Sequence, residues 1–248
     1  MNIKKYLKRI GIYDTPKPTL TTLKGLQKNH LLNIPFENLD IHHKKLITLS
    51  IDDIYDKIVL EKRGGFCYEL NGLFYELLVA IGFEAKRVSA RVYDESKGYG
   101  QEFDHLAIIV TINDTDYLTD VGFGEFAFAP LALNPGVIQN DERGSYLIDK
   151  FDEEYLRVSN LEAGKSTPEY IFKEKKRAFK EYEAMCHYHQ TSPDSHFTTQ
   201  RLISLPTENG RITITGNKLK IKEFEIIKET EIKSEQEFND LIQRLFYK

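Results

Sequence analysis

Hydrophobic residues recur at helical spacing through the first eighty positions of the chain. The i, i+3, i+4, i+7 repeat predicts amphipathic helices over Ile3–Ile10, over "PTLTTLKGLQKNHLL" and over residues 51–59. Ser50, three residues before Asp53, is a typical N-cap for the third helix. "NIPFENLDI" is predicted to be a turn, because Pro35 disfavours helical geometry at the residue before it. A further apolar stripe follows Cys67 and ends at Ile81.

The period changes from helical to alternating near Phe83. "KRVSARVY" predicts a strand, and "DHLAIIVTINDTDYLTDVGFG" predicts two strands around a tight turn at Asn113-Asp114. "GSYLIDKFDEEYLRVSN" predicts a second hairpin, whereas the charged run "PEYIFKEKKRAFKEYEAM" is interpreted as a helix.

The last fifty residues combine hairpins with a helix. "RLISLPTENGRITITGNKLKIKEFEII" carries turn signals at Asn209-Gly210 and Gly216-Asn217. Ser234 and Glu237 have capping-box spacing in front of a final amphipathic helix. Helices, then strands, then a mixture of both predict an α+β fold.

Composition excludes several classes of function. The 248 residues are 41% hydrophobic and 29% charged, with a net charge of −4, which argues against a nucleic-acid partner. No apolar run approaches the ~18 residues that a membrane span requires, and the N-terminus lacks the pattern of a signal peptide. Two cysteines 119 positions apart do not form a disulfide framework, so we expect a cytoplasmic protein.

One of those cysteines lies in a position that suits chemistry. Cys67 follows Gly64 and Gly65 and precedes the apolar stripe of a predicted helix by three residues. The N–H groups of a first helical turn lack helical partners, and with the helix dipole they stabilise an anion such as a thiolate. A buried cysteine that merely fills space is the alternative, because free cysteine is often buried.

A histidine and an aspartate occur at matching places in the first predicted hairpin. His105 begins one strand and Asp120 lies fifteen residues later in the return strand, so an even-length loop puts both on the same face. A four-residue loop makes them direct neighbours, and a two-residue loop makes them diagonal neighbours. A carboxylate there would orient the imidazole and stabilise its charged form. Each residue alone also fits a structural role.

A metal site is not expected. Cys186, His187 and His189 in "CHYH" are too closely spaced for a zinc finger, and no second pair of ligands accompanies them.

The chain resembles the arylamine N-acetyltransferase family. The resemblance rests on "YLKRIG", "PTLTTLKGLQKNHLLNIPFENLDI", "RGGFCYELNGLF", "DHLAIIV", "YLTDVGFG" and "QTSPDSHF", which occur in family order. It implies a cysteine-protease-like arrangement of three domains: a helical bundle over residues 1–82, a β-barrel over 83–189 and an α/β lid over 190–248.

The resemblance also implies an activity and its residues. The family moves an acetyl group from acetyl-coenzyme A to arylamines, arylhydrazines or N-hydroxyarylamines by a ping-pong route, without a metal. Its catalytic triad falls on Cys67, His105 and Asp120. Residues implied to contact the acceptor or the coenzyme are Phe36, Phe103, Phe123, Gly124, Phe126 and Phe197.

Several points stay open at this stage. Arg63 and Glu37 are expected to form an ion pair that braces the cysteine loop. The Cys67 backbone N–H is a candidate oxyanion donor. A hydrolase with the same triad and a non-catalytic binding module are the alternative functions, and the acceptor amine and the oligomeric state are not determined.

Overall fold

The structure is a computed structural model that describes residues 1–14, 16–162 and 164–247. The chain divides into two compact units, and each is assembled from segments that are separated in sequence. The first unit comprises Met1–Thr15, Asn29–Leu70 and Glu183–Lys248, and the second comprises Pro16–Lys28 and Asn71–Tyr182. Two helices, α2 (Leu20–Asn33) and α5 (Cys67–Ile81), continue from one unit into the other.

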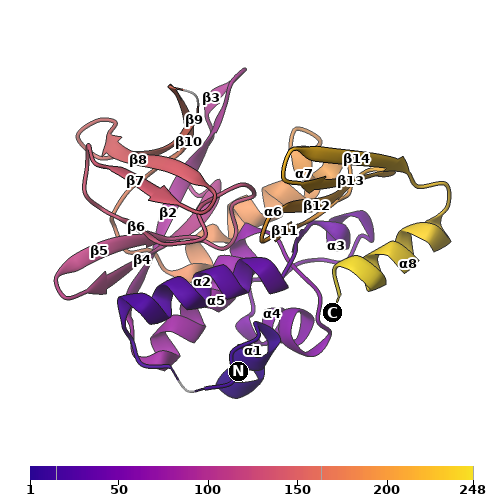
Figure 1. Ribbon diagram of the computed structural model, residues 1–248, viewed down its shortest axis with the longest axis horizontal. Helices are drawn as coiled ribbons and strands as arrows, with labels where there is room; N and C mark the ends of the chain where they lie inside the picture. Colours follow the sequence, from indigo (N-terminus) through magenta and orange to yellow (C-terminus); the bar gives the residue numbers. More distant parts are fainter. Residues whose placement is uncertain (15, 163, 248) are drawn as a thin grey trace. The chain divides into compact units, whose positions relative to one another are not determined.

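The first unit combines short helices with a sheet (Figure 1). Ser50 accepts a hydrogen bond from the Asp53 N–H, as its predicted N-cap role requires. The π-helix η1 follows α4 without a break. The helices of this unit are α1 (Ile3–Arg9), α3 (Leu39–His42), α4 (Ile51–Tyr55), η1 (Asp56–Leu60), α6 (Glu183–Thr191), α7 (His196–Thr199) and α8 (Glu235–Leu245).

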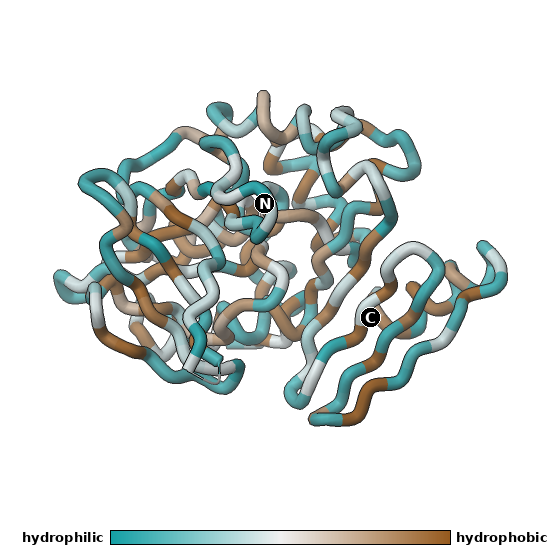
Figure 2. The backbone as a smooth tube through the Cα atoms, turned by 90° about the horizontal axis from the view of Figure 1, so that it is seen from above, coloured by the Kyte–Doolittle hydropathy of each residue, from teal (hydrophilic) through white to brown (hydrophobic). Residues whose placement is uncertain are grey.

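The sheet of the first unit runs in the order β1-β11-β12-β13-β14. Both predicted hairpins form, and the pairs Thr207–Gly210 and Thr215–Lys218 close their turns. Hydropathy changes repeatedly along these strands (Figure 2), and the apolar side packs with Phe238, Leu241 and Ile242 of α8. The strands are β1 (Phe36–Glu37), β11 (Leu202–Thr207), β12 (Gly210–Thr215), β13 (Lys218–Glu223) and β14 (Ile226–Glu231).

The second unit is built on a curled antiparallel sheet (Figure 1). Its strand order is β6-β5-β4-β2-β10-β9-β8-β7, and β3 pairs with β2. The 3₁₀ helix η2 (Phe179–Tyr182) follows the last strand. The strands are β2 (Glu84–Asp94), β3 (Gly98–Tyr99), β4 (His105–Ile112), β5 (Thr115–Thr119), β6 (Leu131–Ala132), β7 (Ile138–Asp141), β8 (Gly144–Lys150), β9 (Leu156–Glu162) and β10 (Lys165–Phe172).

A side chain joins the two outer strands of this curled sheet. Gln139 in β7 donates to the carbonyl of Ala132 in β6 at 2.8 Å, and its Oε1 accepts from the Ala132 N–H at 2.7 Å. The side-chain amide of Gln139 thereby makes the two hydrogen bonds that the backbone of an adjacent strand would make. It joins β6 and β7 at the edges of the sheet, where no backbone pairing connects them.

Two sequence expectations were wrong. The run "PEYIFKEKKRAFKEYEAM" is not one helix, because its first residues belong to β10 and α6 begins at Glu183. Tyr170, Ile171 and Phe172 are buried in β10 between β2 and β9, so pairing with neighbouring strands overrides the helix-forming composition. "NIPFENLDI" is more than a turn, because it contains β1 and the beginning of α3.

The α+β class is confirmed by these elements. Within the described ranges, no helix combines the length and the apolar character that crossing a membrane would need.

Candidate active site

Asp120 is the centre of a buried hydrogen-bond network in the second unit. Its side chain is fully buried, and its Oδ2 lies 2.7 Å from Nε2 of His105 and accepts from the Tyr170 hydroxyl at 3.0 Å. Its Oδ1 accepts from Asn71 Nδ2 and from the backbone N–H groups of Gly122 and Phe123. These partners satisfy both oxygens of a buried carboxylate.

Electrostatics keep this carboxylate ionised. Burial acts to raise the pKa of Asp120, but the charge of His105 and the hydrogen bonds from His105 and Asn71 act against it, and the net shift of the pKa is downward. A carboxylate that is charged and fixed in this way orients the imidazole that it contacts.

The hairpin geometry explains why His105 and Asp120 meet. β4 and β5 are joined by a two-residue turn, because Ile112 pairs with Thr115. Asn113 and Asp114 both have positive φ angles, 50° and 60°, as a type I′ turn requires. Continued past Ile108 and Thr119, this register makes the two residues diagonal neighbours on the predicted face. Asp120 itself lies one residue beyond the end of β5, not within the strand as the sequence predicted.

Asn71 fixes the position of Asp120, and sequence reasoning missed it. Its Nδ2 donates to Asp120 Oδ1 at 2.8 Å and to the Leu106 carbonyl at 2.7 Å, while its Oδ1 accepts from the Val121 N–H at 2.9 Å. A signal was present, because Asn71 is a polar residue one helical turn after Cys67 on an otherwise apolar face.

Tyr170 was also missed, because its segment was interpreted as a helix. A β-bulge between Pro168 and Tyr170 interrupts the pairing of β10 with β9 at this point. Bulges re-aim side chains next to functional sites. Here the Tyr170 hydroxyl donates to Asp120, and its ring lies 5.2 Å from the ring of His105.

Two of the candidate binding residues, Phe123 and Phe126, belong to a group of aromatic rings near His105. The Phe123 ring lies 5.3 Å from the His105 ring and 6.0 Å from the Phe126 ring. Gly124 is exposed, and a Cβ added there would meet no heavy atom within 4 Å. Phe103 is placed differently, because its ring packs edge-on against Tyr182 at 5.1 Å.

In the first unit, the loop before Cys67 packs tightly against β1. Glu37 N–H donates to the Gly65 carbonyl at 2.9 Å, and Phe36 forms a parallel β-bridge with Gly65. A Cβ at Gly64 would lie 2.0 Å from the Pro35 carbonyl oxygen, so the position excludes any side chain. This packing fixes the entry into α5, whose first residue is Cys67.

Candidate binding residues also meet beside this loop. The Phe197 ring lies 6.0 Å from that of Phe36 and 5.9 Å from that of Phe66, the residue before Cys67. Asn38 holds the Phe197 segment, because its Nδ2 donates to the Phe197 carbonyl at 2.9 Å. Phe66 was not singled out from the sequence.

The expected ion pair between Arg63 and Glu37 is present. Arg63 donates to Glu37 Oε1 through Nη2 at 2.8 Å and through Nε at 3.1 Å. The Tyr247 hydroxyl donates to the same oxygen at 3.2 Å. The pair thus links the cysteine loop to β1 and to the C-terminal end of the described chain.

Among the residues that the structure describes, no group of three or more His, Cys, Asp or Glu side chains is arranged to hold a metal ion.

Known proteins resemble the chain in sequence and fold. A family model described as N-acetyltransferase matches residues 19–247. Arylamine N-acetyltransferase 2 of Mus musculus is 33% identical, over 99% of this chain and 93% of its own. An arylamine N-acetyltransferase structure from M. smegmatis is 30% identical, with a TM-score of 0.91 over 99% of this chain and 92% of that chain.

A third relative has a solved structure that contains a ligand. The structure of Mycobacterium marinum arylamine N-acetyltransferase in complex with CoA is 28% identical, with a TM-score of 0.90 over 99% of this chain and 92% of that chain. These neighbours confirm the expected three-part α+β fold, whereas the domain boundaries and the catalytic roles of individual residues stay predictions.

Proposed function

Because the chain belongs to the arylamine N-acetyltransferase family, we propose that Cys67 carries the acetyl group that it transfers. The donor is acetyl-coenzyme A, and the acceptor is an aromatic amine, arylhydrazine or N-hydroxyarylamine. The named CoA complex of a relative supports the donor.

One observation carries the assignment of the triad. Asn71 lies one turn after Cys67 in α5, and its amide donates to the same carboxylate that accepts from His105. The helix that begins with the thiol is therefore hydrogen-bonded to the group that orients the base. Asp120 occupies Nε2 of His105, so Nδ1 is the ring nitrogen proposed to exchange protons in the reaction.

The proposed reaction has two half-reactions. The Cys67 thiolate attacks the thioester carbonyl, and the coenzyme leaves as a thiolate that takes a proton from the His105 imidazolium. The amine nitrogen then attacks the acetyl-cysteine, His105 accepts its proton, and the Cys67 thiolate is expelled. Asp120 stabilises the imidazolium that pairs with the thiolate before the first step and that forms again in the second. The Cys67 N–H stays a candidate oxyanion donor.

Acceptor and coenzyme contacts are proposed in two sets. Phe36 and Phe197 form an aromatic pair beside the cysteine loop, and Phe123 and Phe126 form another beside His105. Gly124 leaves open space for a ligand to approach the backbone. Phe103 is the weakest member, because its ring is engaged by Tyr182. A cytoplasmic location fits the reduced thiol that this chemistry needs.

Mass spectrometry tests the covalent step directly. The protein is mixed with acetyl-coenzyme A alone, digested and searched for acetylated peptides. We expect one acetyl group on Cys67 and a burst of free coenzyme thiol that matches the enzyme concentration. Adding an arylamine should remove the acetyl group and give continuous turnover.

The second cysteine provides a matched control. Burial, with the charge of Glu69, raises the pKa of the Cys186 thiol to about 12, so Cys186→Ala should leave acetylation unchanged. Cys67→Ala should abolish both the burst and the turnover. An acetyl group that forms elsewhere would contradict the proposal, and coenzyme release that continues without amine would identify a hydrolase.

A further inference from the structure

Glu69 lies in the first turn of α5, two residues after Cys67. Its Oε2 accepts a hydrogen bond from the Phe66 N–H at 3.1 Å. Phe66 immediately precedes the helix, so this contact is the half of a capping box in which the third helical residue reaches back. Gly65 makes it possible, because a Cβ there would lie 2.8 Å from the Glu69 Cβ.

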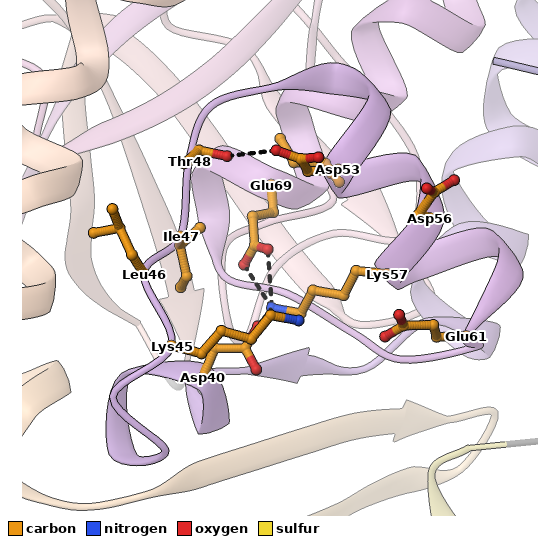
Figure 3. A pocket seen from close by; sticks show the side chains of 11 residues that line it. Asp40, Lys45, Leu46, Ile47, Thr48, Asp53, Asp56, Lys57, Glu61 and Glu69 are labelled. Atoms are coloured by element: carbon orange, nitrogen blue, oxygen red, sulfur yellow. Dashed lines mark hydrogen bonds and ion pairs between the residues drawn. The ribbon is translucent and has the colours of Figure 1, made fainter.

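Lys57 of η1 neutralises this carboxylate. Its Nζ contacts Glu69 Oε1 at 2.9 Å and Oε2 at 3.1 Å, and both side chains are almost completely buried. Lys57 also contacts Asp40 Oδ2 at 3.1 Å. The two groups meet in a pocket of about 290 Å³ (Figure 3).

The pair sits in a larger set of charges. Arg63 contacts both Glu37 and Asp40, so two cations face three carboxylates. The other titratable groups near the pair are Lys45, Asp53, Asp56 and Glu61 around the pocket, Cys186 in α6, and Tyr247 against Glu37 and Arg63.

A carboxylate at this position has two effects that conflict: it stabilises the start of the helix, and it opposes a thiolate at Cys67. A carboxylate in the first turn stabilises the helix start, because it complements the helix dipole and caps a free N–H group. The same negative charge, within the same turn, opposes the formation of a second anion at Cys67. The ammonium group of Lys57 removes this conflict, because it cancels the charge of Glu69 and leaves the hydrogen bond to the Phe66 N–H in place.

We propose that Lys57 and Glu69 are positioning residues for the reaction of Cys67. Glu69 fixes the backbone of the helix start through the Phe66 N–H, and Lys57 cancels the charge of Glu69. The first-turn N–H groups can then stabilise a thiolate at Cys67. The inference rests on the proposed function, because it concerns the thiol that carries the acetyl group.

Two single substitutions should shift the midpoint of the pH profile for Cys67 alkylation in opposite directions. Glu69→Gln keeps an acceptor for the Phe66 N–H but removes the negative charge in the first turn, so the midpoint of the pH profile for alkylation of Cys67 should fall. Burial already raises the pKa of Glu69, and Lys57→Met removes the cation that opposes this rise. Where Glu69 is ionised in this variant, its charge acts on Cys67 without compensation, so the midpoint should rise. We expect each shift to be about half to one pH unit. The double variant Lys57→Met/Glu69→Gln should return close to the wild-type midpoint.

The measurement is the rate of Cys67 alkylation by iodoacetamide between pH 5 and 9, read from digested peptides. Glu76→Gln is the control, because Glu76 lies in the same helix and forms an ion pair with Arg87 at 2.5 Å, more than two turns beyond Cys67. That substitution removes an equal charge and should leave the midpoint unchanged.

Shifts of one common sign, or an equal shift in Glu76→Gln, would overturn the inference, since loss of packing alone predicts no dependence on the sign of the charge. If Lys57→Met does not fold, the Glu69→Gln and double variants still decide the matter: a midpoint for Glu69→Gln that stays constant or rises refutes it. Alkylation requires no acetyl donor. Failure of the proposed function would therefore appear separately, as absent acetylation of a wild-type Cys67 that is alkylated normally.

Discussion

At the scale of single residues, Asn71 shows how one side chain can specify a site. Its amide uses both hydrogens and its oxygen, because it donates to Leu106 and Asp120 and accepts from Val121. These partners fix which end of the amide is nitrogen. Aspartate would lack the two donors and leucine would lack every polar atom. Asn71 therefore defines where the carboxylate of Asp120 can lie.

Replacing Asn71 with alanine should damage both stability and activity. The change leaves a buried N–H and a buried C=O unsatisfied, so we expect the free energy of unfolding to fall by about 2–4 kcal/mol. The rate of Cys67 acetylation should fall by about tenfold or more, because Asp120 loses one of the partners that orient it.

Urea denaturation and the acetylation burst provide the two measurements. Asn33→Ala is a suitable comparison, because Asn33 donates to the Asn29 carbonyl from the last residue of α2 and is only half-buried. It should cost about 1 kcal/mol and leave the burst intact. Equal losses of activity in both variants would mean that Asn71 acts through stability alone.

At the scale of elements, the start of α5 depends on the absence of side chains before it. Gly64 and Gly65 let the loop pair with β1 on one side and admit Glu69 on the other. Neither of these two glycines has the positive φ that usually explains a glycine. Close approach of other atoms is therefore the reason for both.

Gly64→Ala should be severely destabilising, whereas Gly25→Ala should be mildly stabilising. A Cβ at Gly64 would overlap the Pro35 carbonyl, so we expect a loss of about 4 kcal/mol or failure to fold. Gly25 lies inside α2, and a Cβ there would meet nothing within 4 Å, so alanine should add about 0.5–1 kcal/mol. Thermal unfolding of both variants checks this. A tolerated Gly64→Ala would show that the loop can relax away from β1.

At the scale of the whole molecule, stability should decline as the pH falls because of His30. This histidine is fully buried against the Tyr6 hydroxyl, and burial, helped by the charge of Arg9, lowers its pKa to about 3. Below about pH 6.5 the unfolded histidine binds a proton that the folded one rejects, so this contribution to stability is lost as the pH falls. Glu169 acts in the opposite sense, because burial and the charge of Glu125 raise its pKa to about 7.

The variant His30→Gln isolates the contribution of His30 to the pH dependence of stability. Between pH 7 and pH 5, the difference in unfolding free energy between wild type and His30→Gln should shrink by about 2 kcal/mol. Chemical denaturation at several pH values measures it. A constant difference for His30→Gln would show that His30 binds protons equally in the folded and the unfolded protein, and would contradict the prediction.

The sequence carried the parts of the site that local patterns encode. The spacing of fifteen residues, with an even-length loop, predicted that His105 and Asp120 share one face of the hairpin. The two-residue turn then determines that they are diagonal neighbours. Composition misled at Tyr170, because strand pairing with β2 and β9 determined its conformation. The contacts of Lys57 with Glu69 and Asp40 join separate elements, and no periodicity encodes them.

The discontinuous first unit has a consequence for the order of events during synthesis. β1 pairs with β11, and Glu37 receives a hydrogen bond from Tyr247, a residue 210 positions later in the chain. The second unit ends at Tyr182, so a ribosome releases its residues well before those partners. Domains generally fold as they emerge. The cysteine loop therefore acquires its full set of contacts only once Tyr247 has left the ribosome, after the sheet that carries His105 has had time to form.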